Sequence, residues 1–236
     1  MRGLAFSDVS LTGKLLRGAP AQPLVTHYDD AAGTRVELSV ATMRNWAAKT
    51  ANWLVDELDI EPGDRVAVLL PAHWQTAAVL LGAWWCGAEV VTRGPSSVAF
   101  VPPGATAAEA EVTAVASLDP MGRDLRGDVP AGSLDYIGDV RLFGDDYLEL
   151  TPVPGDTPCF MGSTVDEIVT AAAARAEVLG FTSSSRVLST LDWPAAAMDG
   201  FVTVLTAGAS LVQVTNADPA KLTKHQEAER TTDVLT

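Results

Sequence analysis

The sequence predicts an α/β protein made of two similar lobes with mainly parallel sheets. Short apolar segments of strand length alternate with longer apolar segments of helix length, which is the pattern of strand–helix–strand units. A stretch of the first half recurs in the second half at a constant spacing. With 236 residues, 47% of them hydrophobic, the chain can bury a large core. Strand–helix–strand units form parallel pairs with right-handed crossovers.

The first part of the chain is expected to hold a helix, a hairpin and a longer helix. The segment from Leu4 to Leu16 has helical composition. The segment from Pro23 to Ser39 contains two strand-forming runs around a turn-rich centre, which predicts a hairpin. Ser39 or Thr42 is placed to cap a helix that runs to about Leu58.

The next unit is predicted to be a strand at 66–70, a helix from Pro71 to about Cys86 and a strand at 90–91. This helix is apolar on nearly all sides, so other elements must cover most of it.

The repeat has an offset of 121 residues without gaps. It matches Arg65-Val66 with Arg186-Val187 and Gly87-Ala88 with Gly208-Ala209. It predicts helices at 164–179 and 194–207 and strands at 186–190 and 211–214. Residues 1–150 are therefore expected to form a first lobe with the helix and hairpin, and residues 151–236 a second lobe that repeats about 40–92.

The connecting segments are predicted as follows: strands at 98–101 and 112–116 around a short helix, a short helix near 134–142, a linker at 151–155, and a charged helix at 218–230.

Composition excludes several classes of partner. The net charge of −14, with no cluster of Lys or Arg, repels nucleic acid and anionic membranes, so neither is expected as a partner. Residues 1–10 lack the apolar run of a signal peptide, and no apolar stretch approaches the ~20 residues of a membrane span, so a cytoplasmic location is expected. Cys86 and Cys159 are isolated and form neither a redox motif nor a zinc site.

A run of residues resembles a known superfamily. The run Glu61–Pro71, followed by the apolar helix and Cys86–Val91, resembles the first lobe of adenylate-forming ligases, the AMP-binding superfamily that includes acyl-CoA synthetases. Arg186–Leu191 resembles the matching run of their second lobe. The whole chain is most similar to short actinobacterial members. The resemblance implies the fold of the large N-terminal domain, truncated before the third subdomain and the C-terminal domain with its catalytic Lys. It also implies ATP or AMP as a ligand.

The phosphate-binding loop of this superfamily corresponds here to residues 158–167. Relatives have a loop of Gly, Ser or Thr, and Lys at this place, and its amides and Lys hold the ATP phosphates. This chain keeps only Gly162, Ser163 and Thr164, and it has no Lys or Arg from 142 to 174. Thr164 and Glu167 have the spacing of a capping box. Two interpretations follow for this segment: a helix cap, or a residual nucleotide contact.

Other chemical groups are sparse. His27, His73 and His225 have no metal-ligand partner at helical spacing, and His73 precedes a helix, where capping or packing competes with acid–base chemistry. The six Trp residues fall on apolar faces, which favours core anchoring over a ligand cage.

The predicted function is a catalytically incomplete acyl-CoA synthetase-like protein, a pseudoenzyme without catalytic or metal residues. It would act by binding a small acyl or nucleotide ligand between the lobes, or a protein partner, and is expected to form a homo-oligomer. The alternative is an adenylate-forming ligase that another chain or subunit completes.

Overall fold

The computed structural model describes residues 10–236. The first predicted helix is present as α1 (Leu11–Leu15), and the residues of that prediction before Ser10 lie outside the described part.

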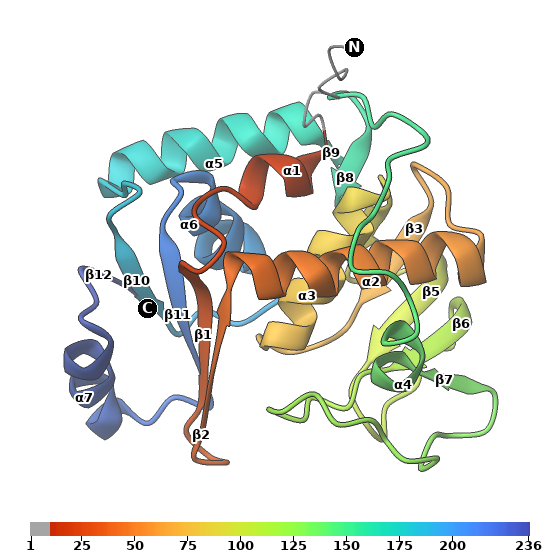
Figure 1. The fold of residues 1–236 in the computed structure, drawn as a ribbon, viewed down its shortest axis with the longest axis horizontal. Coiled ribbons are helices and arrows are strands. Elements are labelled where there is room, and N and C mark those ends of the chain that lie inside the picture. The colour runs from red at the N-terminus through yellow and green to blue at the C-terminus, as the bar shows by residue number, and fades with distance from the viewer. Residues whose placement is uncertain (1–9) are drawn as a thin grey trace.

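The strands form two sheets (Figure 1). The five-stranded sheet has the order β12-β10-β11-β1-β2, and the seven-stranded sheet has the order β7-β6-β5-β3-β4-β8-β9. All pairs are parallel except the hairpins β1–β2 and β8–β9. The α/β class with mainly parallel sheets is confirmed. The strand bounds are β1 Pro23–Asp29, β2 Thr34–Ser39, β3 Arg65–Val68, β4 Glu89–Val91, β5 Ser96–Val101, β6 Ala110–Val115, β7 Ser133–Asp135, β8 Pro158–Phe160, β9 Ser163–Thr164, β10 Arg186–Ser189, β11 Ser210–Thr215 and β12 Asp233–Leu235.

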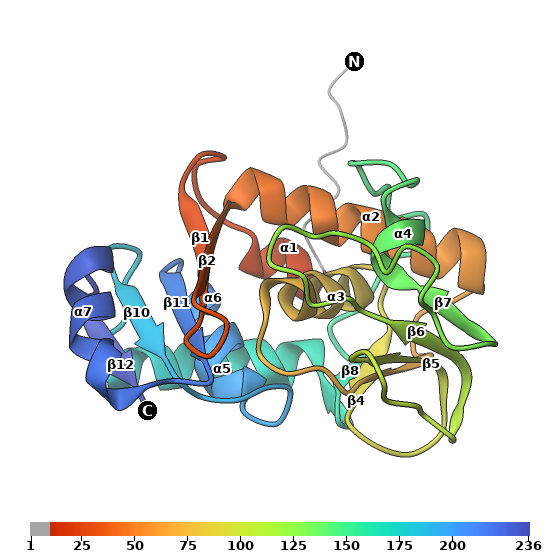
Figure 2. The same cartoon turned by 90° about the horizontal axis from the view of Figure 1, so that it is seen from below.

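The helices lie between and around the sheets. Figure 2 shows α1, α2 and α3 between the two sheets and α7 on the outer side of the five-stranded sheet. Of the two predicted caps, Ser39 and Thr42, Ser39 caps α2, because its side chain accepts a hydrogen bond from the N–H of Thr42. The remaining helices are α2 Val40–Leu58, α3 Trp74–Trp85, α4 Tyr136–Val140, α5 Val165–Leu179, α6 Thr203–Thr206, which follows the π-helical segment Met198–Val202, and α7 Pro219–Glu229.

The offset of 121 residues is visible in the hydrogen-bonded geometry. Arg65 of β3 pairs with Glu89 of β4, and Arg186 of β10 pairs with Ser210 of β11, so the two parallel pairs have the same register. The turn before each pair is also equivalent: the N–H of Asp64 donates to the carbonyl of Glu61, and that of Ser185 to Thr182. Equivalent left-handed positions follow the same offset: Asp59 with Gly180, and Gly87 with Gly208.

Each sheet contains strands from both sides of residue 150. The hairpin β1–β2 joins the five-stranded sheet through β11, with Val25 opposite Leu211. The strands β8 and β9 join the seven-stranded sheet through β4, where Val90 pairs with Phe160. The expected lobe boundary at residue 150 is therefore not a boundary between sheets.

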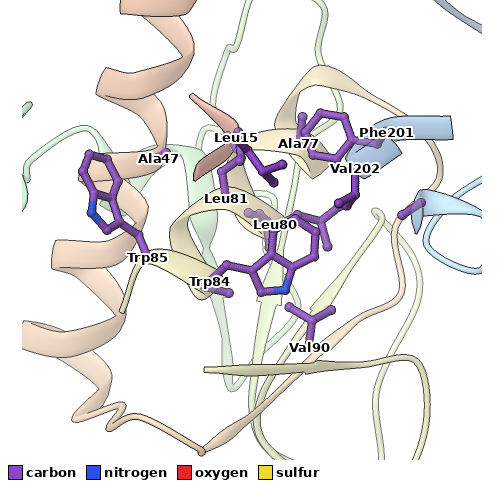
Figure 3. Close-up of a cluster of buried hydrophobic side chains, with 14 of the residues drawn as sticks. Leu15, Ala47, Ala77, Leu80, Leu81, Trp84, Trp85, Val90, Phe201 and Val202 are labelled. Carbon is purple, nitrogen blue, oxygen red and sulfur yellow. The ribbon is translucent and has the colours of Figure 1, made fainter. Parts of the chain in front are cut away.

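The core is centred on α3, and every residue of this helix is buried, as its all-round apolar sequence predicted. Figure 3 shows Leu80 and Trp84 of this helix among side chains from α1, α2 and the segment around Phe201. The helices α2 and α3 approach closely at Gly82: a Cβ atom there would lie 2.4 Å from Cβ of Thr50.

Two predicted helices differ in the structure. The segment 102–109, between β5 and β6, is a loop and not a short helix, because Pro102-Pro103-Gly104 leaves Gly104 with a φ of +83°. The helix predicted at 194–207 begins only at Met198 and passes through the π-helical segment into α6.

Candidate functional site

The predicted phosphate-loop position is a two-residue turn between β8 and β9. Met161 and Gly162 form the turn, with φ values of +51° and +88°. Two successive positive φ values are typical of the tight hairpin turn that matches the twist of its strands. The two residues of β9 join this turn to α5, so no open glycine-rich loop precedes that helix.

Carboxylates already occupy backbone N–H groups of this segment. The N–H of Gly162 donates a 2.8 Å hydrogen bond to Oε1 of Glu89 on β4. The N–H of Thr164 donates over 2.9 Å to Oε2 of Glu167, and the side chain of Thr164 accepts from the N–H of Glu167. The capping box is thereby confirmed. The N–H groups of the next two residues, 165 and 166, donate to the carbonyls of Thr157 and Gly155.

Two cations approach this segment, and each is paired with a carboxylate. Nζ of Lys14 lies 3.5 Å from Oδ1 of Asp166, and Nε of Arg65 lies 3.6 Å from Oε2 of Glu89. The sequence prediction considered only nearby positions and missed both cations, because they come from α1 and β3.

A cavity of about 190 Å³ lies where β3, β10 and β11 end. In parallel α/β folds, ligands bind outside the carboxyl ends of the strands. The cavity is lined by apolar and polar side chains that include Leu191, Asp192 and Gln213. Gln213 is 1% exposed; its Nε2 donates to the carbonyl of Leu191, and its Oε1 has no hydrogen-bond partner.

Two histidines meet beside this cavity. The rings of His27 and His73 lie 4.5 Å apart in an edge-to-face arrangement. His73 caps α3, because its Nδ1 accepts from the N–H of Gln75. Nε2 of His27 lies 2.9 Å from Oγ1 of Thr215, which itself donates to the carbonyl of Ala72, a cavity residue.

The histidines are held neutral. Thr215 already donates its proton, so it accepts from His27, and Nδ1 of His27 is then a buried acceptor without a partner. Burial lowers the pKa of His27 to about 4, although the charge of Asp29 opposes this. Burial and the charge of His27 lower the pKa of His73 to about 3. Sequence reasoning did not find this pair, because 46 residues separate its members.

The third histidine and both cysteines lie elsewhere. Nε2 of His225 is 2.8 Å from Oδ1 of Asp30. Cys86 and Cys159 are buried free thiols, and burial raises the pKa of each to about 12. Within residues 10–236, His, Cys, Asp and Glu form no group of three or more suited to a metal ion.

Comparisons with known proteins decide the family. Residues 17–111 match the model of the family described as AMP-binding enzyme. A Mycobacterium tuberculosis protein described as "TIGR03089 family protein" is 46% identical over 233 residues, which is 94% of this chain and 94% of that protein.

The chain belongs to the TIGR03089 family, within the AMP-binding superfamily.

Solved structures agree on the fold of this TIGR03089 family member. The Brucella canis acyl-CoA synthetase is similar with a TM-score of 0.77 and 18% identity, over 96% of this chain and 47% of that chain. The N-terminal domain of FACL13 from Mycobacterium tuberculosis has a TM-score of 0.71 and 18% identity, over 94% of this chain and 61% of that chain. The TIGR03089 chain thus spans about half the length of the Brucella canis enzyme and has an acyl-CoA synthetase-like fold.

The superfamily implies ATP, and the residues of this TIGR03089 chain do not fit its triphosphate. A triphosphate needs free N–H groups and unpaired cations at the turn. Here Glu89 and Glu167 take the N–H groups of Gly162 and Thr164, and the two cations described at this segment are paired with carboxylates. An incoming phosphate would also meet these two negative charges.

None of the helices formed by residues 10–236 combines the length and the apolar character that crossing a bilayer requires.

Proposed function

We propose that this protein binds a small ligand and does not activate carboxylates with ATP. The observation that carries the proposal is the hydrogen bond from the N–H of Gly162 to Glu89, because it puts a carboxylate at the segment that the resemblance to adenylate-forming ligases assigns to phosphate binding. Adenylate formation depends on stabilising the negative charge of the transferred phosphoryl group, and a glutamate at that place opposes it.

The ligand site proposed is the 190 Å³ cavity at the strand ends. Its volume is below the roughly 300–1,000 Å³ of drug-sized sites, so it suits a small molecule. Leu191 and Val214 supply apolar surface, while Asp192 and Gln213 supply acceptors. Asp192 would repel a free carboxylate. Oε1 of Gln213 is buried and has no partner, so a rotation of this side chain toward the cavity would let it accept from the N–H of an amide. A short acyl amide fits both kinds of surface, because its acyl chain is apolar and its N–H can donate to an acceptor.

Adenylation is tested by ATP–pyrophosphate exchange. The purified chain is given Mg-ATP and a series of short carboxylic acids, with an active acyl-CoA synthetase as the positive control. We expect no exchange above the blank. Exchange by the purified chain, or a triphosphate seated at Gly162 in ATP-soaked crystals, would contradict the proposal.

Ligand binding is tested by thermal shift with short acyl amides and the carboxylic acids of equal length. A ligand at 100 times its Kd stabilises the folded state by about 2.7 kcal/mol. Gln213→Leu removes the acceptor and should abolish the amide response. Gln226→Leu on α7, away from the cavity, is the matched control and should keep it. If the Gln213→Leu variant and the wild type respond equally to the amides, the ligand does not bind in this cavity.

We also propose that the protein acts in the cytoplasm as a homo-oligomer. The two buried free thiols support a reducing compartment. Parallel sheets usually have helices on both faces. On the outer face of the seven-stranded sheet, the area around Ala67 and Ala99 is covered by the 102–109 loop and not by a helix. Leu69 and Met161 are 37% and 43% exposed. A second copy on this face would give a dimer in light scattering, and Leu69→Lys should then shift it to the monomer.

A further inference from the structure

The largest cavity described has a volume of about 620 Å³ and lies away from the strand-end cavity. Its walls come from the second half of α2, the turn at 60–62 and the segment 146–151, with Cys86 at the end of α3. It shares no lining residue with the strand-end cavity. Its volume is within the range of small-molecule sites.

Apolar groups form much of the wall. Val55 and Ile60 contribute from α2 and the turn that follows it, and Leu148 and Leu150 from the facing segment. The two leucines are 70% and 82% exposed. Covering such side chains is favourable by about 25 cal/mol per Å² of apolar surface, so an apolar ligand body would gain from this wall.

The segment that carries the leucines is fixed to the body of the protein. Nδ2 of Asn52 donates to the carbonyls of Gly144 and Asp146, over 3.1 and 3.0 Å. Oε1 of Glu149 accepts from Nε1 of Trp85 over 2.9 Å. The wall is therefore built in place and does not need a ligand to form it.

The charged side chains that line the cavity are all acidic. Asp56, Glu61 and Asp146 contribute three carboxylates, and the described lining contains no Lys, Arg or His. Tyr147 supplies an aromatic ring, and its pKa is raised by burial, then by Cys86 and by the charges of Glu149 and Asp56. A cation is attracted both to carboxylates and to the face of such a ring.

The nearby cations do not neutralise the cavity. Nζ of Lys49 lies 2.9 Å from Oδ1 of Asp145 and donates to the carbonyl of Phe143. The guanidinium of Arg44 lies 5.2 Å from the ring centroid of Trp85. Neither side chain lines the cavity, and the side chains of Asp56 and Glu61 have no ion-pair partner among residues 10–236.

We propose that this cavity binds a small organic cation, a protonated amine carried on an aliphatic chain. The chain lies against Val55, Leu148 and Leu150, and the ammonium lies near Asp56 and Glu61. A carboxylic acid of the same chain length is repelled by the same carboxylates. The site is independent of the proposed acyl-amide site and of the question of ATP.

The test is isothermal titration calorimetry with octylamine, octanoate and octanol, which share a chain and differ in the head group. Octylamine is protonated at pH 7, as a lysine side chain is. We expect octylamine to bind more tightly than octanol, octanoate to bind least, and the octylamine affinity to fall as salt increases.

Variants locate the binding. Asp56→Asn combined with Glu61→Gln should weaken octylamine binding about five- to tenfold and leave octanol unchanged, because exposed charge pairs contribute modestly. Both side chains are exposed, so folding is retained, and a thermal melt checks this. Glu57→Gln is the matched control: this exposed carboxylate follows Asp56 on α2 but does not line the cavity.

Three outcomes overturn the proposal: no binding of octylamine, equal binding of octylamine and octanoate, or an equal effect of the control and the double variant. Loss of acyl-amide binding in Gln213→Leu leaves this test unaffected, so the two sites succeed or fail separately.

Discussion

Oε1 of Glu229 accepts a 2.7 Å hydrogen bond from Nε of Arg35, and this contact joins the last helix to the second strand. Arg186 of β10 also donates to this carboxylate, as does the hydroxyl of Tyr28. The side chain of Glu229 is 6% exposed. One carboxylate thus holds together α7, the β1–β2 hairpin and β10 of the five-stranded sheet.

Replacement of this carboxylate should destabilise the protein. Glu229→Gln leaves two arginines without their common partner, and we expect the free energy of unfolding to fall by about 2–3 kcal/mol in urea denaturation. Glu227→Gln, on the exposed side of the same helix, should change it by less than about 0.5 kcal/mol. Equal effects of the two substitutions would show that the network does not stabilise the fold.

The carboxylate of Glu229 also makes the stability of the fold depend on pH. Burial acts to raise the pKa of Glu229, but hydrogen bonds from Arg35, Tyr28 and Arg186 outweigh it and lower the pKa from 4.5 to about 2. Because the folded-state pKa is depressed, this stability is present above pH 4.5 and is lost as the pH falls toward 2. Denaturation at pH 5 and pH 3 should show this loss in the wild type and a smaller one in Glu229→Gln.

The histidine pair predicts a second loss of stability at higher pH. His27 and His73 have pKa values of about 4 and about 3 in the fold and 6.5 as the ordinary value. Unfolding therefore takes up protons below pH 6.5, and stability falls between pH 6.5 and about 4 through His27 and on to about 3 through His73. From pH 7 to pH 5 we expect a loss on the order of 2–4 kcal/mol.

Nuclear magnetic resonance provides the direct measurement for this pair. The ring signals of His27 and His73 should not titrate between pH 8 and pH 5. Titration of either ring near pH 6.5 would refute the neutral pair.

The contact between α2 and α3 predicts a steric effect. In Gly82→Ala the new methyl group meets Thr50 in the contact between α2 and α3, and we expect a loss of about 2–3 kcal/mol in thermal or urea unfolding. Gly33→Ala is the comparison: its Cβ would meet nothing within 4 Å, and its φ of +67° costs about 1 kcal/mol. A smaller loss at Gly82 than at Gly33 would contradict the close packing.

Local sequence signals predicted a large part of the fold. The hairpin, the α2 cap at Ser39 and the capping box at Thr164 depend on residues a few positions apart, so the sequence shows them directly. The apolar sequence of α3 also predicted that this helix is buried on all sides. The helix predicted between β5 and β6 was wrong, since the turn chemistry of Pro102-Pro103-Gly104 outweighed the run of alanines that follows.

The candidate sites depend on residues that are distant in the sequence. Glu89 and Gly162 are 73 positions apart and meet only because β8 adds to the seven-stranded sheet beside β4. Arg65 reaches the same carboxylate from β3. Periodicity and spacing give the type of an element and not its neighbours in a sheet. The sequence could therefore show that residues 142–174 contain no Lys or Arg, but not that Glu89 accepts from the N–H of Gly162.

The mixed membership of the five-stranded sheet has a consequence for biosynthesis. The hairpin β1–β2 is synthesised before its parallel neighbour β11, which is made only at residues 210–215. Until then, one edge of β1 has no partner, and an unpaired strand edge invites association with other chains. The nascent chain must therefore extend to residues 210–215 before this sheet closes, and limiting chaperone capacity should increase its aggregation.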